Sequence, residues 1–153
     1  MASSFTQLYF HVIFAVKYRQ ALIAPNWENQ LFNVITAKLQ ELGHSLIAIN
    51  GTTDHVHILW RHNRNESLPN TMKLIKGSSS HWINHTIDCP TIFRYQHGYG
   101  AFSVSVDRVP QVAAYIRNQK VHHGKKNFLQ EYEELLSAHH AEDPTLYQFA
   151  PLQ

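Results

Sequence analysis

The chain has 153 residues, 44% of them hydrophobic, and a formal net charge of +2. This length and composition predict one domain with a core of its own, and the small charge does not by itself indicate a nucleic-acid-binding protein. The single cysteine excludes an internal disulfide, and no stretch reaches the roughly 18 apolar residues of a membrane span, so we expect a cytoplasmic protein that contacts no membrane.

The chain begins with a strand pattern followed by a helix pattern. Residues 5–18 are rich in β-branched and aromatic residues, and Val12 and Phe14 alternate with their neighbours, so we predict a long first strand. Residues 27–42 repeat apolar side chains at the helical period, and Gly43 fits the position that ends a helix.

A hairpin with two histidines is predicted next. Residues 45–49 and 55–60 are β-branched runs separated by an Asn-Gly turn signal. Because side chains alternate between the faces of a strand, His55 and His57 share one face. Paired imidazoles on a rigid strand could bind a metal or act in catalysis, although ordinary hydrogen-bonded sheet residues give the same pattern.

A second helix, predicted at residues 68–85, contains an unusual polar segment. Gly77 and the three serines that follow it weaken a helix, since serine competes for backbone hydrogen bonds and glycine costs about 1 kcal/mol. Close approach of a nucleic-acid phosphate would explain these small residues, and so would tight packing of the helix. The composition favours neither explanation.

The C-terminal half supplies a last strand and further helices. Residues 98–106 alternate apolar and polar side chains and predict a fourth strand. Asp107 fits the N-cap of a helix over residues 108–123, and a shorter helix is predicted over residues 128–138. The acids gather late, with Glu131 among them, which indicates an acidic C-terminal end, although charge clusters are more often solvated surface.

The order strand, helix, strand, strand, helix, strand predicts an α+β, ferredoxin-like (RRM-like) fold. We expect a four-stranded antiparallel sheet with helices on one face, additional C-terminal helices, and the other face or an edge free for a ligand or a second subunit. Residues 1–138 would form a single domain that includes the helix at 108–123, and residues 139–153 would form a tail.

Two residues on the helix at 108–123 could complete a site with the histidines. Tyr115 and Gln119 are four residues apart, so both project from one helix face. Two imidazoles and an amide oxygen could hold a divalent ion that polarises a phosphate, while a phenol attacks it. Taken alone, Tyr115 would more often be a packed aromatic residue and Gln119 a surface residue.

Two segments resemble known motifs. Residues 53–59, Thr-Asp-His-Val-His-Ile-Leu, resemble the histidine-hydrophobic-histidine (HUH) signature of the single-tyrosine HUH transposases, and residues 115–119, Tyr-Ile-Arg-Asn-Gln, resemble their tyrosine motif. Supporting similarity at residues 10–19, 74–80 and 98–105 extends the resemblance over most of the chain. These enzymes mobilise small bacterial insertion sequences as single-stranded DNA, and their relatives act at repetitive extragenic palindromes (REP).

The resemblance implies a complete set of roles for the site. It implies that His55, His57 and the side-chain oxygen of Gln119 bind Mg²⁺ or Mn²⁺, and that Tyr115 attacks DNA to leave a 5′-phosphotyrosine and a free 3′-hydroxyl, with no nucleotide cofactor. It further implies a homodimer that recognises DNA hairpins at the element ends, in which the tyrosine helix can complete the partner's site. The ligand types alone leave the metal open.

Basic and small residues are the predicted contacts to the DNA backbone. They are Lys17, Arg19, Lys73, Lys76, Ser78, Ser79 and Ser80. Two other functions stay open: a non-catalytic or domesticated hairpin-binding protein of the same fold, and a two-histidine phosphoesterase that forms no covalent intermediate.

Overall fold

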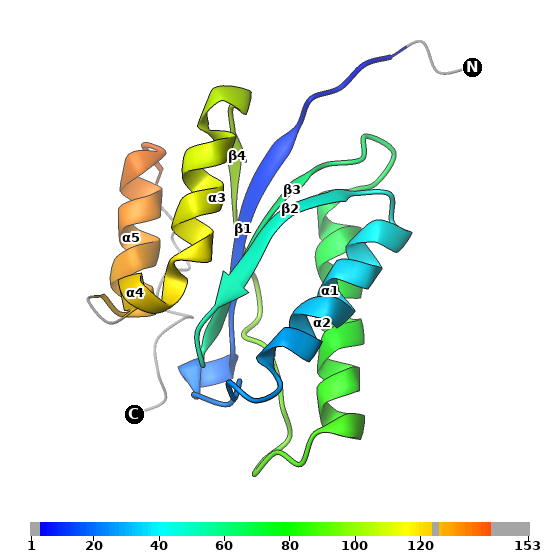
Figure 1. Ribbon diagram of the computed structural model, residues 1–153, viewed down its shortest axis with the longest axis vertical. Helices are drawn as coiled ribbons and strands as arrows, with labels where there is room; N and C mark the ends of the chain where they lie inside the picture. The colour runs from blue at the N-terminus through cyan, green and yellow to red at the C-terminus, as the bar shows by residue number, and fades with distance from the viewer. Residues whose placement is uncertain (1–3, 124–125, 142–153) are drawn as a thin grey trace.

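The computed structural model describes residues 4–123 and 126–141, which are built around a four-stranded antiparallel sheet (Figure 1). The sheet has the order β2-β3-β1-β4. Its strands are β1 (Tyr9–Ala15), β2 (Ser45–Gly51), β3 (His55–Arg61) and β4 (Gly100–Val104). The predicted α+β, ferredoxin-like fold is confirmed. Within the described residues, no helix is long and apolar enough to cross a membrane.

Helices cover both faces of the sheet (Figure 1). One face carries α1 (Glu28–Glu41) and α2 (Leu68–Thr86), and the other carries α3 (Val109–Arg117), α4 (Gln119–His123) and α5 (Phe128–Ala138). Short 3-10 turns, η1 (Lys17–Arg19) and η2 (Val106–Arg108), follow β1 and β4. Of the two surfaces expected to be free, the second face or an edge, the second face is covered, because the C-terminal helices of the same chain fold back over it.

Alternation along β1 explains how one sheet supports two cores. Val12 and Phe14 are buried in the core shared with α1 and α2, whereas Ile13 and Ala15 are buried on the opposite face beneath α5. Successive side chains of a strand point to opposite faces, so a strand covered on both sides is apolar throughout. Gly100 on β4 permits this packing, because an added Cβ would collide with a side chain of α5.

The helices α1, α2 and α5 form close to where the sequence predicts them. Gly43 follows α1 with a φ of +83°, as expected of a glycine that ends a helix. The side chain of Ser67 accepts a hydrogen bond from the Asn70 amide at the start of α2. Reciprocal hydrogen bonds between Asn127 and Gln130 form a capping box at the start of α5.

Three strands differ in their boundaries from the prediction. The fourth strand, predicted over residues 98–106, is limited to Gly100–Val104, because the chain enters η2 at Val106. The hairpin turn lies at residues 52–54, because β2 continues through Gly51, which still pairs with β3. The first strand is shorter than residues 5–18, because the chain turns sharply after β1. Tyr18 and Arg19 have φ values of 57° and 50° in this turn, a conformation that costs energy for residues with a side chain.

The predicted single helix over residues 108–123 is wrong, because it is broken into α3 and α4. Asn118, between them, has a φ of −97° and a ψ of 21°, which is outside the helical range. Asp107 lies inside η2 instead of capping α3, and Arg108 holds the N-cap position without a side-chain hydrogen bond. Residues 142–153 of the predicted tail lie outside the described residues.

A buried imidazole, His44, joins the end of α1 to α2 and to the chain after β3. The backbone amide of Asn63 donates to Nδ1 of His44 at 2.9 Å, so Nε2 carries the proton and donates to the hydroxyl of Thr71 at 2.8 Å. A second proton on this ring would face the Asn63 donor. Burial, with His62 stacked alongside, lowers the pKa of His44 to about 4.

We expect the free energy of unfolding to depend on the protonation of His44 between pH 7 and pH 5. The pKa of this group is about 4 in the folded chain and near its ordinary value of 6.5 in the unfolded chain. Between these values the unfolded chain binds more protons, so this stabilisation is present above pH 6.5 and is lost as the pH falls toward 4. Between pH 7 and pH 5, the Tm of the His44→Gln protein should therefore fall by several degrees less than the Tm of the wild type.

The exposed histidine His85 on α2 provides the matched control, and His85→Gln should keep the full wild-type decrease in Tm. His55, whose pKa is raised, contributes stability that is lost as the pH rises, but it does so in all three proteins. The comparison therefore isolates His44. Equal decreases in the wild type and in His44→Gln, measured by thermal unfolding, would contradict this account.

Candidate active site

The structure brings together the four residues that the sequence singled out for chemistry. His55 and His57 are 1% and 0% exposed and share the face of β3 that α3, α4 and α5 cover. Gln119 at the start of α4 reaches the same point, where its Oε1 lies 3.3 Å from Nε2 of His55. Tyr115 on α3 is half-buried, and its ring lies edge-on to His57 with the ring centres 5.9 Å apart.

A carboxylate at the centre of this cluster was not predicted. Oε1 of Glu131 accepts a hydrogen bond from Nε2 of His57 at 2.6 Å and lies 3.2 Å from Nε2 of His55. Its Oε2 accepts from the side chain of Gln119 at 3.2 Å and from the hydroxyl of Tyr115. Glu131 is 4% exposed, so its assignment to an acidic surface was wrong.

The sequence did contain a signal for this buried acid. Glu131 shares one face of α5 with Phe128, Tyr132 and Leu135, at helical spacings of three, four and seven residues from Phe128. An acid on the apolar face of an amphipathic helix needs a polar partner inside the protein. The pattern therefore indicates a buried carboxylate, although it does not say which residues surround it.

The side chain of each histidine is oriented by a second partner. Nδ1 of His55 hydrogen-bonds Oδ1 of Asp54 at 2.6 Å, and Nδ1 of His57 hydrogen-bonds Nε2 of His11 at 2.8 Å. Both Nε2 atoms are thereby directed toward Glu131. Histidines that bind metals are usually held in this way, with one nitrogen fixed by the protein and the other turned inward.

His11 is a second site residue that the sequence analysis missed. It lies on β1 and faces the same side as Ile13, whose backbone is paired with His57 in the sheet. Burial and the neighbouring His57 lower the pKa of His11 to about 3, so its ring is neutral near neutral pH. Only the pairing of β1 with β3 brings the two rings together, and this pairing cannot be read from either strand alone.

The charges of the cluster are set by its hydrogen bonds. Burial would raise the pKa of Glu131, but hydrogen bonds with His55 and His57 outweigh this effect and hold the pKa far below its usual range. For His55 burial acts downward, and the Asp54 and Glu131 carboxylates outweigh it and raise the pKa. Burial and Glu131 together raise the pKa of Tyr115, so the phenol keeps its proton beside this carboxylate.

The cluster offers a suitable set of ligand atoms for a divalent ion. His55, His57 and Glu131 each provide one ligand atom, and these atoms all lie within 4.8 Å of one another. Two imidazole nitrogens and one carboxylate oxygen suit a divalent transition metal, and the oxygens of Glu131 and Gln119 also suit Mg²⁺ or Mn²⁺. The Glu131 carboxylate is ionised, so it supplies negative charge where a cation would sit.

Tyr115 meets the histidines of its own chain. The hydroxyl of Tyr115 and Nε2 of His57 both donate to the carboxylate of Glu131. The resemblance to the HUH transposases implied that a tyrosine helix can complete the site of a partner chain instead. In this structure the phenol and the histidines of one chain lie together around Glu131.

A pocket of about 520 Å³ opens beside the cluster. Its walls come from β4, η2, α3 and α5. Tyr115 and His11 form part of the wall, and both also contact the buried cluster through hydrogen bonds. The side chain of Tyr115 therefore borders both this pocket and the buried cluster.

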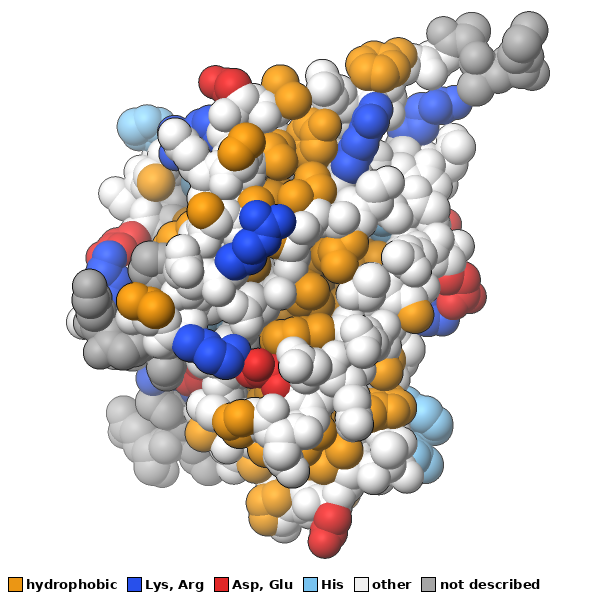
Figure 2. Space-filling model, in the orientation of Figure 1, with side chains coloured by type: hydrophobic (Ala, Val, Ile, Leu, Met, Phe, Trp, Pro, Cys, Tyr) orange, Lys and Arg blue, Asp and Glu red, His pale blue; other side chains and the backbone are white. Residues whose placement is uncertain are grey.

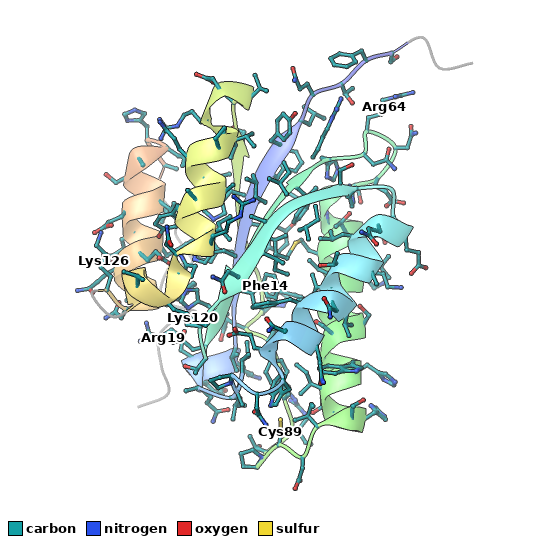
Figure 3. All side chains as sticks on the ribbon, in the orientation of Figure 1. Phe14, Arg19, Arg64, Cys89, Lys120 and Lys126 are labelled. Atoms are coloured by element: carbon teal, nitrogen blue, oxygen red, sulfur yellow. The ribbon has the colours of Figure 1, made fainter. Side chains whose placement is uncertain are left out.

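The predicted DNA contacts fall into two groups on different parts of the molecule. Lys17 and Arg19 lie in η1, directly after the end of β1 that pairs with His55. Figure 3 shows Arg19 and Lys120 at the same end of the sheet, and Lys120 there donates to the carbonyl of Gly51 at 3.2 Å. Nε and Nη1 of Arg19 are buried, and no hydrogen-bond partner for them exists among the described residues.

The second group lies on α2, on the face of the sheet away from Tyr115. Ser79 is fully buried, and its hydroxyl pairs with that of Tyr95 at 2.9 Å, so it cannot contact DNA without opening this packing. The ammonium of Lys76 donates to the carbonyls of Gln96 and Gly98, and burial lowers its pKa to about 8. Helix packing therefore accounts for these two side chains. The remaining members, Lys73, Ser78 and Ser80, are exposed or half-buried.

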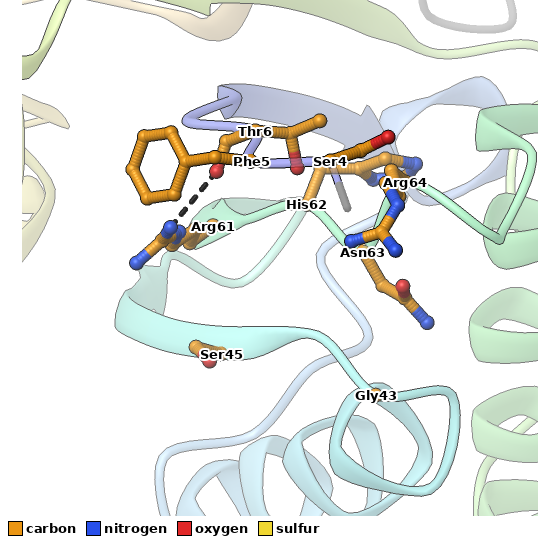
Figure 4. A pocket seen from close by; sticks show the side chains of 9 residues that line it. All are labelled: Ser4, Phe5, Thr6, Gly43, Ser45, Arg61, His62, Asn63 and Arg64. Carbon is orange, nitrogen blue, oxygen red and sulfur yellow. Dashed lines mark hydrogen bonds between the residues drawn. The ribbon is translucent and has the colours of Figure 1, made fainter. Parts of the chain in front are cut away.

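A second, smaller pocket lies at the other end of β3 from His55 (Figure 4). Its volume is about 240 Å³. Arg61 donates to the carbonyl of Thr6 at 2.8 Å, and its guanidinium lies over the exposed ring of Phe5, 5.6 Å from the ring centre. Figure 2 shows basic side chains beside a band of hydrophobic side chains on the face that carries β2 and α3.

Comparison with known families and proteins gives a consistent result. The sequence model of a family described as "transposase IS200 like" matches residues 4–119. A curated relative, the ISDra2 transposase TnpA of Deinococcus radiodurans, is 28% identical over 74 residues, which are 48% of this chain and 53% of the relative. The chain thus spans about half the length of this curated relative.

Two solved structures share the fold. A crystal structure of a candidate transposase from Deinococcus radiodurans R1 aligns with a TM-score of 0.63 and 23% identity, over 78% of this chain and 95% of the other. A REP-associated tyrosine transposase bound to a REP hairpin aligns with a TM-score of 0.61 and 12% identity, over 81% of this chain and 73% of the other. At these identities the likeness establishes the fold alone.

Proposed function

The chain belongs to the family of IS200-like transposases, and we propose that it cleaves and rejoins single-stranded DNA through a covalent bond to Tyr115. The observation that carries this proposal is the shared carboxylate: Glu131 binds the hydroxyl of Tyr115 with one oxygen and the pair His55 and His57 with the other. A phosphate that approaches the phenol therefore also approaches the two histidines.

The chemistry suits a phenol. The oxygen of Tyr115 attacks the phosphorus of a phosphodiester, the bond from phosphorus to the 3′ oxygen breaks, and the products are a 5′-phosphotyrosine and a free 3′-hydroxyl. A phenol, with a pKa near 10, is less basic than an alcohol, so it can leave again when a 3′-hydroxyl returns. The energy of the phosphodiester is kept in the covalent bond, and rejoining needs no nucleotide cofactor.

We propose that His55 and His57 hold Mg²⁺ or Mn²⁺, with oxygen ligands from Glu131 and Gln119. The fit rests on the two Nδ1 atoms, which are fixed by protein partners, and on the two Nε2 atoms, which face an ionised carboxylate. When bound, the ion would polarise the phosphate. The sequence predicted His55, His57 and Gln119 as ligands, and the structure adds Glu131. This carboxylate supplies the negative charge that the amide of Gln119 lacks.

Glu131→Gln should weaken Mn²⁺ binding at least about tenfold, because a neutral amide replaces a charged ligand of nearly the same shape. Titration of Mn²⁺ followed by electron paramagnetic resonance measures the free ion directly. Glu133→Gln, on the exposed side of α5, is the matched control and should bind Mn²⁺ like the wild type. Equal affinities for Glu131→Gln and the control would show that Glu131 is not a ligand.

We further propose hairpin DNA as the substrate and a homodimer as the active assembly. The hairpin is supported by the fold shared with a transposase bound to a REP hairpin. Lys17 and Arg19 are candidate backbone contacts, because they are two cations in the turn that follows the end of β1 paired with His55. The edge strand β2, with half-buried Ile47 and Ile49, offers a surface through which two sheets could join.

A hairpin-binding protein without catalysis is the second candidate function. The raised pKa of Tyr115 favours it, because a protonated phenol held by Glu131 is a weak nucleophile in this state. Labelled single-stranded hairpins from the DNA that flanks the gene, incubated with the protein and Mg²⁺ or Mn²⁺, separate the functions on a denaturing gel. We expect a protein-linked strand. An intact strand would favour the second candidate, and a cut strand without linkage would indicate a phosphoesterase.

A further inference from the structure

The pocket of about 520 Å³ beside Tyr115 has the composition of a small-molecule site. Its volume falls within the roughly 300–1,000 Å³ typical of such sites. Apolar side chains from α3 and α5, including Val112, Leu135 and Ala138, form much of its lining. Ligand sites usually combine such walls with a few polar groups that fix the orientation of the ligand.

The polar groups of this pocket are available to a ligand. Ser103, Arg108 and Gln111 line it, and within the described part of the chain no hydrogen bond or ion pair engages their side chains. Arg108 is exposed, and none of the described residues that line the pocket is an aspartate or a glutamate. The lining therefore offers one permanent positive charge and several uncharged hydrogen-bonding groups. This combination suits an anionic ligand that carries a planar polar ring.

The position of the pocket determines which ligand it would hold. Tyr115 belongs both to the pocket and to the cluster around Glu131, and His11 likewise joins the pocket to His57. A phosphate at the phenol would therefore lie next to this pocket, within reach of a nucleoside that the pocket holds. The imidazole of His139 also lines the pocket and adds a second ring on which a base can stack.

We propose that this pocket binds the nucleoside attached to the phosphate that Tyr115 attacks, with Arg108 contacting a neighbouring phosphate. The proposal rests on the function proposed above and assigns part of the DNA recognition to the protein itself. A base would stack in the pocket and hydrogen-bond Gln111 or Ser103. It would thereby fix which phosphodiester lies against the phenol.

Two single-stranded probes separate contacts to bases from contacts to the backbone. One is a labelled twelve-nucleotide oligo-dT, and the other is an abasic strand of the same length and charge. Both are titrated with the Tyr115→Phe protein, which cannot cleave them, and binding is followed by fluorescence anisotropy. We expect oligo-dT to bind about tenfold more tightly than the abasic strand, as a stacked base would give.

Variants of the pocket should change the two affinities in different ways. In the Tyr115→Phe background, Ala138→Trp fills the pocket. The preference for oligo-dT over the abasic strand should then fall from about tenfold to about threefold or less. Arg108→Ala should weaken both probes by a similar factor and leave the preference unchanged. Ala37→Trp, at an exposed alanine of α1 on the other face of the sheet, is the matched control and should keep the preference.

The results that would overturn the proposal are distinct from failure of the proposed function. An unchanged preference in a folded Ala138→Trp protein, verified by circular dichroism and thermal unfolding, would overturn it, as would a preference near one in the Tyr115→Phe parent. If the wild type still forms a covalent adduct in that case, the function stands and only the pocket is wrong. Loss of the preference in Ala138→Trp supports the pocket even if no adduct forms.

Discussion

Tyr115→Phe should bind hairpin DNA and form no covalent adduct with it. The substitution removes only the hydroxyl oxygen that we assign as the nucleophile and keeps the ring that packs beside His11 and His57. Loss of a nucleophile removes its whole contribution to the chemical step, so the adduct should fall at least about 10³-fold. A denaturing gel with labelled hairpin DNA measures the adduct, and a binding titration measures the retained affinity.

A second tyrosine provides the control for this experiment. Tyr99→Phe makes the same chemical change at a half-buried residue that directly precedes β4 and lies outside the cluster. The Tyr99→Phe protein should form the adduct like the wild type. Undiminished adduct from a folded Tyr115→Phe protein would remove Tyr115 from the mechanism. Equal loss in both variants would mean that the change acts through folding and not through the nucleophile.

His57→Ala should abolish cleavage while the fold remains. His57 is fully buried and supplies the shortest hydrogen bond from an imidazole to Glu131, so its loss disrupts the proposed metal site. Removing a residue that only orients a metal ligand typically lowers metal affinity or activity about 10–100-fold. Removing a ligand itself should therefore lower the cleavage rate at least about 100-fold. The rate is measured on the labelled hairpin with Mg²⁺ or Mn²⁺, and excess chelator should have the same effect on the wild type.

The exposed residue His81 on α2 allows a matched variant, and His81→Ala should cleave at the wild-type rate. Circular dichroism and thermal unfolding establish that His57→Ala is folded, since removing a buried imidazole leaves Glu131 with fewer donors. Full cleavage by the wild type in excess chelator would contradict the metal requirement. Wild-type cleavage by a folded His57→Ala protein would contradict the role of the histidine.

The parts of the site that the sequence predicted are those set by local geometry. The two-residue period of a strand places His55 and His57 on one face, and a spacing of four residues brings Tyr115 and Gln119 toward one point even though Asn118 interrupts the helix. These relations survive errors in the element boundaries, because each depends on only a few residues of backbone.

The parts that the sequence did not predict depend on tertiary contacts. Glu131 enters the site because α5 folds back across the sheet, and His11 enters because β1 lies beside β3. Neither residue is near His57 in the chain, so no local pattern connects them. The same folding back of α5 covers the face of the sheet that was expected to be free. The missed carboxylate of Glu131 and the wrongly predicted free face therefore have one cause.

The most direct test of the proposed chemistry is to locate the covalent bond. Wild-type adduct can be digested with nuclease and trypsin and analysed by mass spectrometry. Residues 109–117 form one tryptic peptide, Val-Pro-Gln-Val-Ala-Ala-Tyr-Ile-Arg, in which Tyr115 is the only tyrosine. We predict that this peptide carries the nucleotide. A nucleotide on a peptide that contains Tyr99 or Tyr132 instead would contradict the assignment of Tyr115 as the nucleophile.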